Sequence, residues 1–231
     1  MSGEHAALRL LRFLSAEEPR SGEEIARELG CSRSAVWKQV EILRQLGVGV
    51  ESMAGRGYWL AEPIELLDSD TIQKRIGERE AACLNGLEIW PELDSTNAEL
   101  QRRAPTGQHG LAILSERQTV GRGRHGRQWF SPLARNIYLS LGWRFEAGIG
   151  ELSALPLVLA LAVGEALSQC ELEGHVIKWP NDILKEGQKL AGCLVEVQGD
   201  ASGPCTAVMG VGINVHMPVG TDGADSIDQP W

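Results

Sequence analysis

Hydrophobic residues near the start of the chain recur at the spacing of an α-helix. Residues 5–14 form a first amphipathic segment, and "EEIAREL" forms a second. Ser21 and Glu24 have the spacing of a capping box at the start of the second segment, and Gly30 suits its end. The pattern therefore predicts two short helices within the first thirty residues.

A third helix and a hairpin are predicted next. Val36, Val40 and Leu43 lie at i, i+4 and i+7, and Gly47 would end this helix. Residues 48–60 then alternate around a Gly-Arg-Gly sequence, which favours a tight β-turn. Helix, helix, turn, helix and hairpin is the order of a winged helix-turn-helix domain, predicted over residues 1–62.

The outward face of the third predicted helix suggests DNA binding. Its start and exposed side, with the hairpin tip, would present Ser32, Arg33, Ser34, Lys38, Arg56 and either Gln39 or Arg44. Lys and Arg only balance Glu in this region, so a small helical module for protein interaction stays open as an alternative.

The rest of the chain alternates strand and helix patterns. Pro63 marks the start of a linker with a short helix, 63–82, and a second domain would follow over 83–231. Strands are predicted within 86–97, 110–118, 136–145, 175–185, 188–197 and 205–215, with a buried helix within 151–169. Turns at Glu186-Gly187 and 199–203 contain no helix, so the sheet should be antiparallel or mixed and the domain α+β.

Composition narrows the function classes. The 231 residues carry a net charge of −9, so any DNA binding must come from a local patch. The five cysteines include no C-x-x-C pair, which argues against zinc sites and disulfide frameworks. The longest apolar run, 155–163, is far below the ~18 residues of a membrane span. Charges interrupt the first twenty residues, so no secretion signal is expected, and we predict a soluble cytoplasmic protein without a membrane partner.

The sequence "GRGRHGRQW", 121–129, fits G-x-G-x-x-G but is crowded with arginine. A dinucleotide-binding turn needs a helix directly after it, whereas here Ser-Pro and another predicted strand follow. A loop with little side-chain bulk can wrap a ligand, and arginines form forked contacts with phosphate or carboxylate. An anion-binding loop and a merely solvated basic loop both stay open at this point.

Five blocks in order resemble the signature of biotin protein ligases. They are "LDSTN" (93–97), "RQTVGRGRHGRQWFSP" (117–132), "KWPNDIL" (178–184), "KLAGCLVEV" (189–197) and "GVGINV" (210–215). With a winged helix in front, the chain resembles the bifunctional type that also represses biotin synthesis genes. The resemblance implies a class II synthetase-like catalytic domain. It also implies a reaction in which biotin and MgATP give biotinyl-5′-AMP, followed by acyl transfer to a lysine of a biotin carboxyl carrier protein.

The resemblance also implies roles for individual residues. Lys189 and Arg124 would be catalytic, and Asp182 would be the carboxylate nearest to Mg²⁺. Biotin would be bound by Ser95, Thr96, Asn97, Gln118, Arg122, Gly123, Arg124 and Lys189. ATP or the adenylate would be bound by Arg127, Trp129, Lys178, Asn181 and Asn214.

Partners follow from the same resemblance. These are the carrier protein, operator DNA and a second copy of the chain once the adenylate is bound. Members of the family continue past the "GINV" block into an SH3-like β-barrel, whereas this chain ends at "GTDGADSIDQPW". We therefore expect that barrel to be missing, and a biotin-responsive regulator with little ligase activity is the alternative. A lipoate ligase, which shares the catalytic fold, is disfavoured by the 121–129 and 178–182 sequences.

Overall fold

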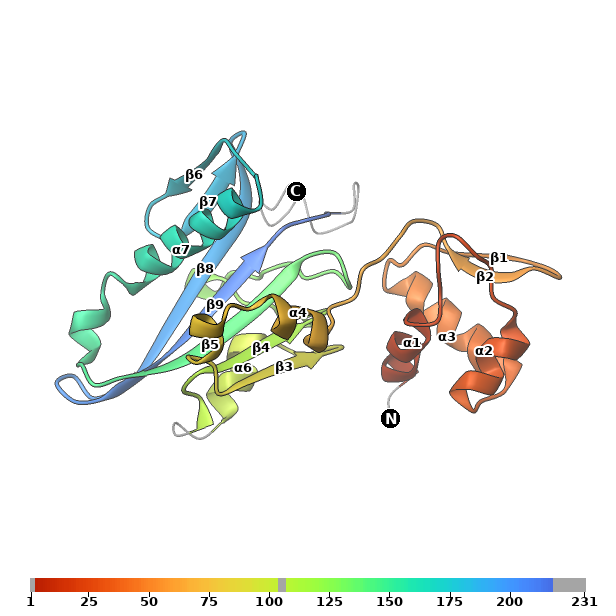
Figure 1. Ribbon diagram of the computed structural model, residues 1–231, viewed down its shortest axis with the longest axis horizontal. Helices are drawn as coiled ribbons and strands as arrows, with labels where there is room; N and C mark the ends of the chain where they lie inside the picture. Colours follow the sequence, from red (N-terminus) through yellow and green to blue (C-terminus); the bar gives the residue numbers. More distant parts are fainter. Residues whose placement is uncertain (1–2, 104–106, 218–231) are drawn as a thin grey trace. The chain divides into compact units, whose positions relative to one another are not determined.

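The computed structural model describes residues 3–103 and 107–217 and divides into two compact units (Figure 1). The first contains the residues up to 67 together with 132–134, and the second contains the remainder. The division after Leu67 lies within the predicted linker, and the last residues of the predicted second domain, 218–231, lie outside the described part of the chain.

The first unit has the predicted winged helix-turn-helix order. Its elements are α1 (Gly3–Leu11), α2 (Gly22–Leu29), α3 (Arg33–Gln45), β1 (Val50–Met53) and β2 (Gly57–Leu60). β1 and β2 pair antiparallel. Apolar side chains at the predicted helical spacing form its core, including the fully buried Leu10, Ile25, Val36, Val40 and Leu43.

The ends of α2 are set by the residues that the sequence singled out. Ser21 Oγ accepts the Glu24 amide at 3.2 Å, and the Glu24 carboxylate accepts the Ser21 amide at 3.1 Å. Gly30 ends the helix with φ 65°, a left-handed conformation that glycine adopts without a steric penalty. Ser32 then caps α3 by accepting the Ala35 amide at 3.2 Å.

The second unit is built on a seven-stranded mixed sheet. Its helices are α4 (Ser69–Arg75), α5 (Glu78–Ala81), α6 (Thr96–Arg102) and α7 (Leu155–Gln169), with 3-10 turns η2 (Arg124–Gly126) and η3 (Ile149–Leu152). Its strands are β3 (Gly86–Trp90), β4 (Leu111–Ser115), β5 (Ile137–Phe145), β6 (His175–Lys178), β7 (Asp182–Lys185), β8 (Gln188–Gly199) and β9 (Cys205–Ile213). The order is β3-β4-β5-β9-β8-β7-β6, and only the β3–β4 pair is parallel.

Helices α6 and α7 of this unit cover different parts of the sheet. Leu100 of α6 packs with Ile113 and Val208, from β4 and β9. α7 packs through Ala160 and Val163 against a cluster with side chains from β7, β8 and β9 (Figure 1). Because side chains alternate along a strand, the β8 and β9 residues between those of the α7 cluster face the other side of the sheet, where Trp129 and α6 lie.

One predicted strand is wrong. The segment 175–185 was predicted as one strand, although its Trp-Pro sequence predicted a turn, and it forms the antiparallel hairpin of β6 and β7. The chain turns at Trp179, Pro180 (which follows a cis peptide bond) and Asn181. Pro180 has no amide hydrogen and cannot continue the ladder of a strand in the middle of a sheet.

The Glu186-Gly187 turn was predicted and is confirmed. Both residues have positive φ, 53° and 81°, and they connect β7 to β8 as an antiparallel pair. A two-residue connection with positive φ at both positions matches the twist of the flanking strands. The 199–203 region likewise connects the antiparallel strands β8 and β9.

The segment Ile149–Gln169 is long and apolar enough, by composition, to cross a membrane. It extends beyond the 155–163 run at both ends, because it includes η3 before the run and the rest of α7, to Gln169, after it. The prediction of a buried helix here is wrong, because only 17% of the apolar window is buried: Ala160 and Val163 pack against the sheet, whereas Val158 and Leu161 are exposed. A helix of this length and composition can also belong to a globular domain. Length and hydropathy are therefore weak evidence for a membrane span here.

We predict that Ser21→Ala destabilises the first unit by about 1 kcal/mol, because the Glu24 amide loses its acceptor at the start of α2. Ser21→Thr is the matched control, since it keeps the hydroxyl. The measurement is the free energy of unfolding of each variant in urea. Equal stability of the Ala and Thr variants would show that the capping box contributes nothing.

Candidate functional site

A cavity of about 330 Å³ lies in the second unit. Its wall comes from the start of α6, the 121–129 loop, the β6–β7 turn and the paired strands β8 and β9. This size is at the lower end of the range typical of small-molecule sites. The cavity brings together residues from all five sequence blocks that were separate along the chain.

Glycines on β8 and β9 form the floor of the cavity. Gly192 pairs with Gly212, and a Cβ atom at either position would overlap the Trp129 indole. Gly210 lies two residues before Gly212 on β9, and a Cβ atom there would overlap the Asn97 side chain. Bare backbone therefore allows Trp129 and Asn97 to lie directly against the sheet.

Hydroxyl and amide groups at the start of α6 form one polar part of the wall. Ser95 caps the helix, and the Thr96 amide and hydroxyl both donate to Gln118 Oε1, at 2.9 and 3.2 Å. Gln118 in turn donates to Ser131 Oγ at 3.1 Å. Asn97 is buried, and its Oδ1 accepts from Ser140 Oγ at 2.5 Å. These bonds fix the side chains that face the cavity.

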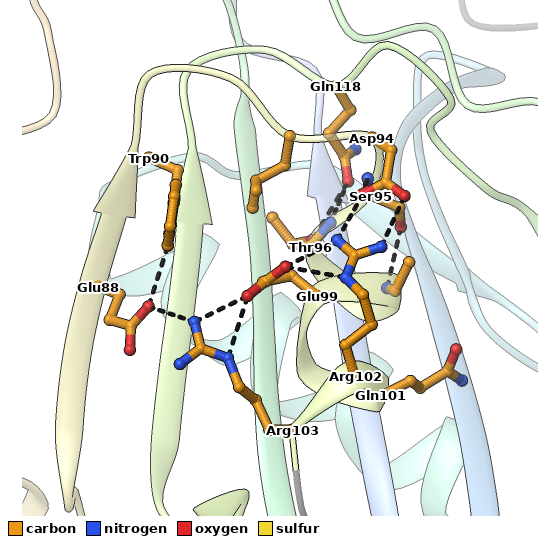
Figure 2. A network of polar contacts seen from close by, with 12 residues as sticks. Glu88, Trp90, Asp94, Ser95, Thr96, Glu99, Gln101, Arg102, Arg103 and Gln118 are labelled. Atoms are coloured by element: carbon orange, nitrogen blue, oxygen red, sulfur yellow. Dashed lines mark hydrogen bonds and ion pairs between the residues drawn. The ribbon is translucent and has the colours of Figure 1, made fainter.

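Ion pairs hold α6 from its outer side (Figure 2). Arg102 is the last residue of the helix, and Asp94 precedes its cap. The Arg102 guanidinium donates to both Asp94 carboxylate oxygens at 2.8 Å. Glu99 accepts from Arg102 at 2.7 Å and from Arg103 at 3.0 Å, and Arg103 also donates to Glu88 at 2.9 Å. Hydrogen bonding to Arg102 lowers the pKa of the Asp94 carboxyl to about 2. The Asp94–Arg102 pair is therefore charged at neutral pH and is lost as the pH falls toward that value.

The 121–129 loop closes on itself. The Trp129 amide donates to the Gly121 carbonyl at 2.9 Å, and the Gly123 amide donates to the Arg127 carbonyl at 2.7 Å. A single 3-10 turn with His125 at φ 57° forms its tip, and no α-helix follows before β5. This geometry agrees with the argument against a dinucleotide-binding turn.

Lys189 lies beside a carboxylate and an indole. Its Nζ is 2.9 Å from Asp182 Oδ1 and 5.3 Å from the centre of the Trp129 ring. Arg124 donates to Asn181 Oδ1 at 2.7 Å, so the loop is tied to the β6–β7 turn. Burial raises the pKa of the nearby Cys193 thiol to about 12, and the thiol stays protonated at neutral pH.

The charge of the cavity wall is strongly positive. Five cationic side chains line it, from Arg122, Arg124, Arg127, Lys178 and Lys189, against the single carboxylate of Asp182. The whole chain carries −9, so this concentration is local. Such a wall attracts anions, and guanidinium groups bind phosphate or carboxylate oxygens in pairs.

Most of the residues expected to bind biotin or ATP line this cavity; their roles stay predictions. The lining residues among them are Ser95, Thr96, Asn97, Gln118, Arg122, Gly123, Arg124, Arg127, Trp129, Lys178, Asn181, Asp182 and Lys189. Asn214 is not among the lining residues. It is buried, and its side-chain amide donates to the Lys189 carbonyl at 3.0 Å, so it contacts the strand behind the site.

The sequence analysis did not single out several residues of the site. The cavity is also lined by His125, Gln128, Trp179 and Pro180. In the sequence, only their position next to predicted site residues indicated this. Glu196 and Ser140 contact lining residues from behind. Gly192 and Glu196 lie an even number of residues apart on β8, so the alternation of side chains could have placed Glu196 on the same face of the sheet as the cavity floor. Its contact with Asn97 could be seen only in the tertiary structure.

The residues expected to bind DNA lie in the first unit. Arg33, Ser34, Lys38 and Arg56 are exposed, and Arg33 pairs with Glu23 at 3.1 Å. Ser32 is exposed and also serves as the cap of α3. Arg44 donates to the Val50 carbonyl at 2.9 Å, which ties α3 to the hairpin, and the Gln39 side-chain oxygen is buried. The surface that contacts DNA would therefore consist of the exposed residues of this group, without Gln39 and Arg44.

Comparison with known sequences identifies both units. Residues 90–214 match the biotin/lipoate A/B protein ligase family, and residues 7–59 match an HTH domain. The chain is 40% identical over 224 residues to a bifunctional ligase/repressor BirA from Salmonella typhimurium, covering 97% of this chain and 68% of that protein. It is also 40% identical to the BirA of Escherichia coli, covering 91% of this chain and 64% of that protein.

Solved structures share the fold of the second unit. A biotin protein ligase from Aquifex aeolicus, in complex with biotin and ATP, matches 64% of this chain and 59% of its own at 32% identity and a TM-score of 0.51. A Leishmania major enzyme in complex with biotinyl-5-AMP matches 64% of each chain at 28% identity and the same TM-score.

We predict that Gly212→Ala displaces the Trp129 indole and destabilises the second unit by about 1–3 kcal/mol, since the new methyl group overlaps the ring. Gly150→Ala is the matched control, because a Cβ atom there meets nothing within 4 Å. Near-UV circular dichroism and urea unfolding report the two effects. If the Gly212 variant matches the Gly150 variant in both, the indole does not depend on the bare floor.

Proposed function

This chain belongs to the biotin/lipoate A/B protein ligase family, and we propose that it is an ATP-dependent ligase that attaches biotin to a lysine of a biotin carboxyl carrier protein. The observation that carries the proposal is the composition of the cavity. Hydroxyl and amide groups at the start of α6 suit the polar ureido end of biotin, and five cations suit its carboxylate and the ATP phosphates.

The chemistry needs positioning and charge compensation more than a protein nucleophile. A biotin carboxylate oxygen would bond to the α-phosphorus of ATP as pyrophosphate leaves. The carrier lysine nitrogen would then bond to the acyl carbon, with loss of AMP and a proton. Both reactants of the first step are anions, so Lys189 and Arg124 would lower the cost of bringing them together. The Trp129 indole would pack against the adenine.

Mg²⁺ would accompany ATP. Asp182 is the one carboxylate among the lining residues, and no group of three His, Cys, Asp or Glu side chains in the described residues would hold a metal by itself. This donor set fits an ion that is bound mainly by ATP phosphates and water. The ion would offset phosphate charge while Asp182 keeps Lys189 in place at 2.9 Å.

The decisive experiment supplies the chain with biotin, ATP, Mg²⁺ and a carrier domain, and detects transfer on a streptavidin blot. A carrier whose acceptor lysine is replaced by arginine is the control. Labelling of the intact carrier alone supports the proposal. Absence of both biotinyl-5′-AMP and labelling contradicts it, and labelling with lipoate in place of biotin would assign the related activity.

Lys189→Ala is expected to lower the rate of adenylate formation by a factor on the order of 10²–10³, because a cation beside the reacting anions is lost. Lys185→Ala, on the adjacent strand and outside the cavity wall, is the control. Pyrophosphate release by each variant is measured at saturating substrate. A near-normal rate for the Lys189 variant would remove this residue from the mechanism.

We also propose that the first unit binds operator DNA of biotin synthesis genes and represses them, as a homodimer once the adenylate is bound. The exposed Arg33, Ser34 and Lys38 on α3 and Arg56 on the hairpin support this surface. All five cysteines are free, which supports a reducing, cytoplasmic setting. DNA binding that responds to biotin without any carrier labelling would instead assign a regulator with little ligase activity.

Lys38→Ala should weaken binding to such DNA and reduce the slope of log affinity against log salt by about 1, as expected for one lost phosphate contact. Arg79→Ala, an exposed cation on α5, is the control for the change in charge. Fluorescence anisotropy at several salt concentrations gives both quantities. Identical slopes for the two variants would exclude Lys38 from the interface.

A further inference from the structure

Glu196 joins two parts of the cavity wall from behind. It lies on β8 and does not line the cavity itself. Its Oε2 atom accepts from Asn97 Nδ2 at 2.8 Å and from an Arg122 guanidinium nitrogen at 3.2 Å. Asn97 belongs to α6 and Arg122 to the arginine-rich loop, so a single carboxylate oxygen connects the two segments.

One guanidinium nitrogen of Arg122 forms hydrogen bonds to neighbouring side chains, and its Nε atom forms none among the described residues. The nitrogen that contacts Glu196 also donates to Gln101 Oε1 at 3.0 Å. Gln101 points away from Glu99 and Arg103, so it serves a different side of α6 (Figure 2). The Arg122 Nε atom is buried and has no acceptor among the described residues. A buried donor without a partner is unfavourable, and an anionic ligand in the adjoining cavity would supply the acceptor.

Asn97 is fixed by the same carboxylate. Its Nδ2 donates to Glu196 while its Oδ1 accepts from Ser140, so the two bonds determine which way the amide points. If Glu196 were neutral, its side chain could still offer an oxygen to Asn97. It could no longer form an ion pair with the Arg122 guanidinium at the same time.

We propose that Glu196 is a positioning residue that holds Arg122 as a preformed donor for the ligand's anionic group and links it to Asn97. This proposal rests on the proposed biotin site. There, Glu196 would connect Asn97, near the ureido end of the ligand, to Arg122, near its anionic end. Preorganised donors bind more tightly because they lose less freedom when the ligand arrives.

The first test needs no ligand. In NMR spectra of the full chain, Glu196→Gln should shift the Arg122 Nε–H signal and the Asn97 side-chain amide signals together. Glu173→Gln, the same chemical change at an exposed residue outside the cavity, should shift neither. Unchanged Arg122 and Asn97 signals in the Glu196 variant would overturn the linkage, whatever the ligand.

The second test is a double-mutant cycle on biotinyl-5′-AMP release. Glu196→Gln should speed release at least about tenfold, the loss expected for a charge-assisted contact. In an Arg122→Met background the same change should add less than about twofold. A full tenfold effect in that background, or none in the wild-type background, would overturn the proposal. If the wild-type chain holds no adenylate but the signals still shift together, the biotin assignment fails and the linkage stands.

Discussion

The close approach of the Trp129 indole to the bare backbone of Gly192 and Gly212 fixes the geometry of the candidate site. The loop that carries the arginines closes through the Trp129 amide and the Gly121 carbonyl. Lys189 lies beside the same ring, 5.3 Å from its centre. A side chain on either floor glycine would move the ring and with it the cations that the proposed reaction needs.

Charge in the cavity is concentrated, and three of its five cations are held by neighbouring side chains. Lys189 pairs with Asp182, Arg124 with Asn181, and Arg122 with Glu196 and Gln101. The Asp182 and Glu196 carboxylates offset part of the repulsion between the cations, and the wall stays positive overall. Fixed cations need little rearrangement when two anionic reactants enter, which is the physical basis of the proposed rate enhancement.

The short helix α6 depends on its surroundings. Seven residues are too few for a stable helix in isolation. The Ser95 cap, the buried Leu100 and the ion pairs from Asp94 to Arg103 compensate for its length. The helix presents Thr96 and Asn97 to the cavity, so the outer ion pairs contribute to the site without touching a ligand (Figure 2).

The sequence by itself determined the local structure and the chemical character of this protein. Helical spacing and the Ser21–Glu24 box predicted the first unit, and positive-φ turn residues such as Gly187 predicted the antiparallel connections. The arginine-rich loop and Lys189 could be identified because they lie in compact, ordered motifs. The tertiary structure alone decided that Asn214 bonds to the Lys189 carbonyl and is not among the cavity residues, and that Glu196 joins Asn97 to Arg122. Those contacts join residues far apart along the chain, and their spacing in sequence carries no information on which strands and loops will meet.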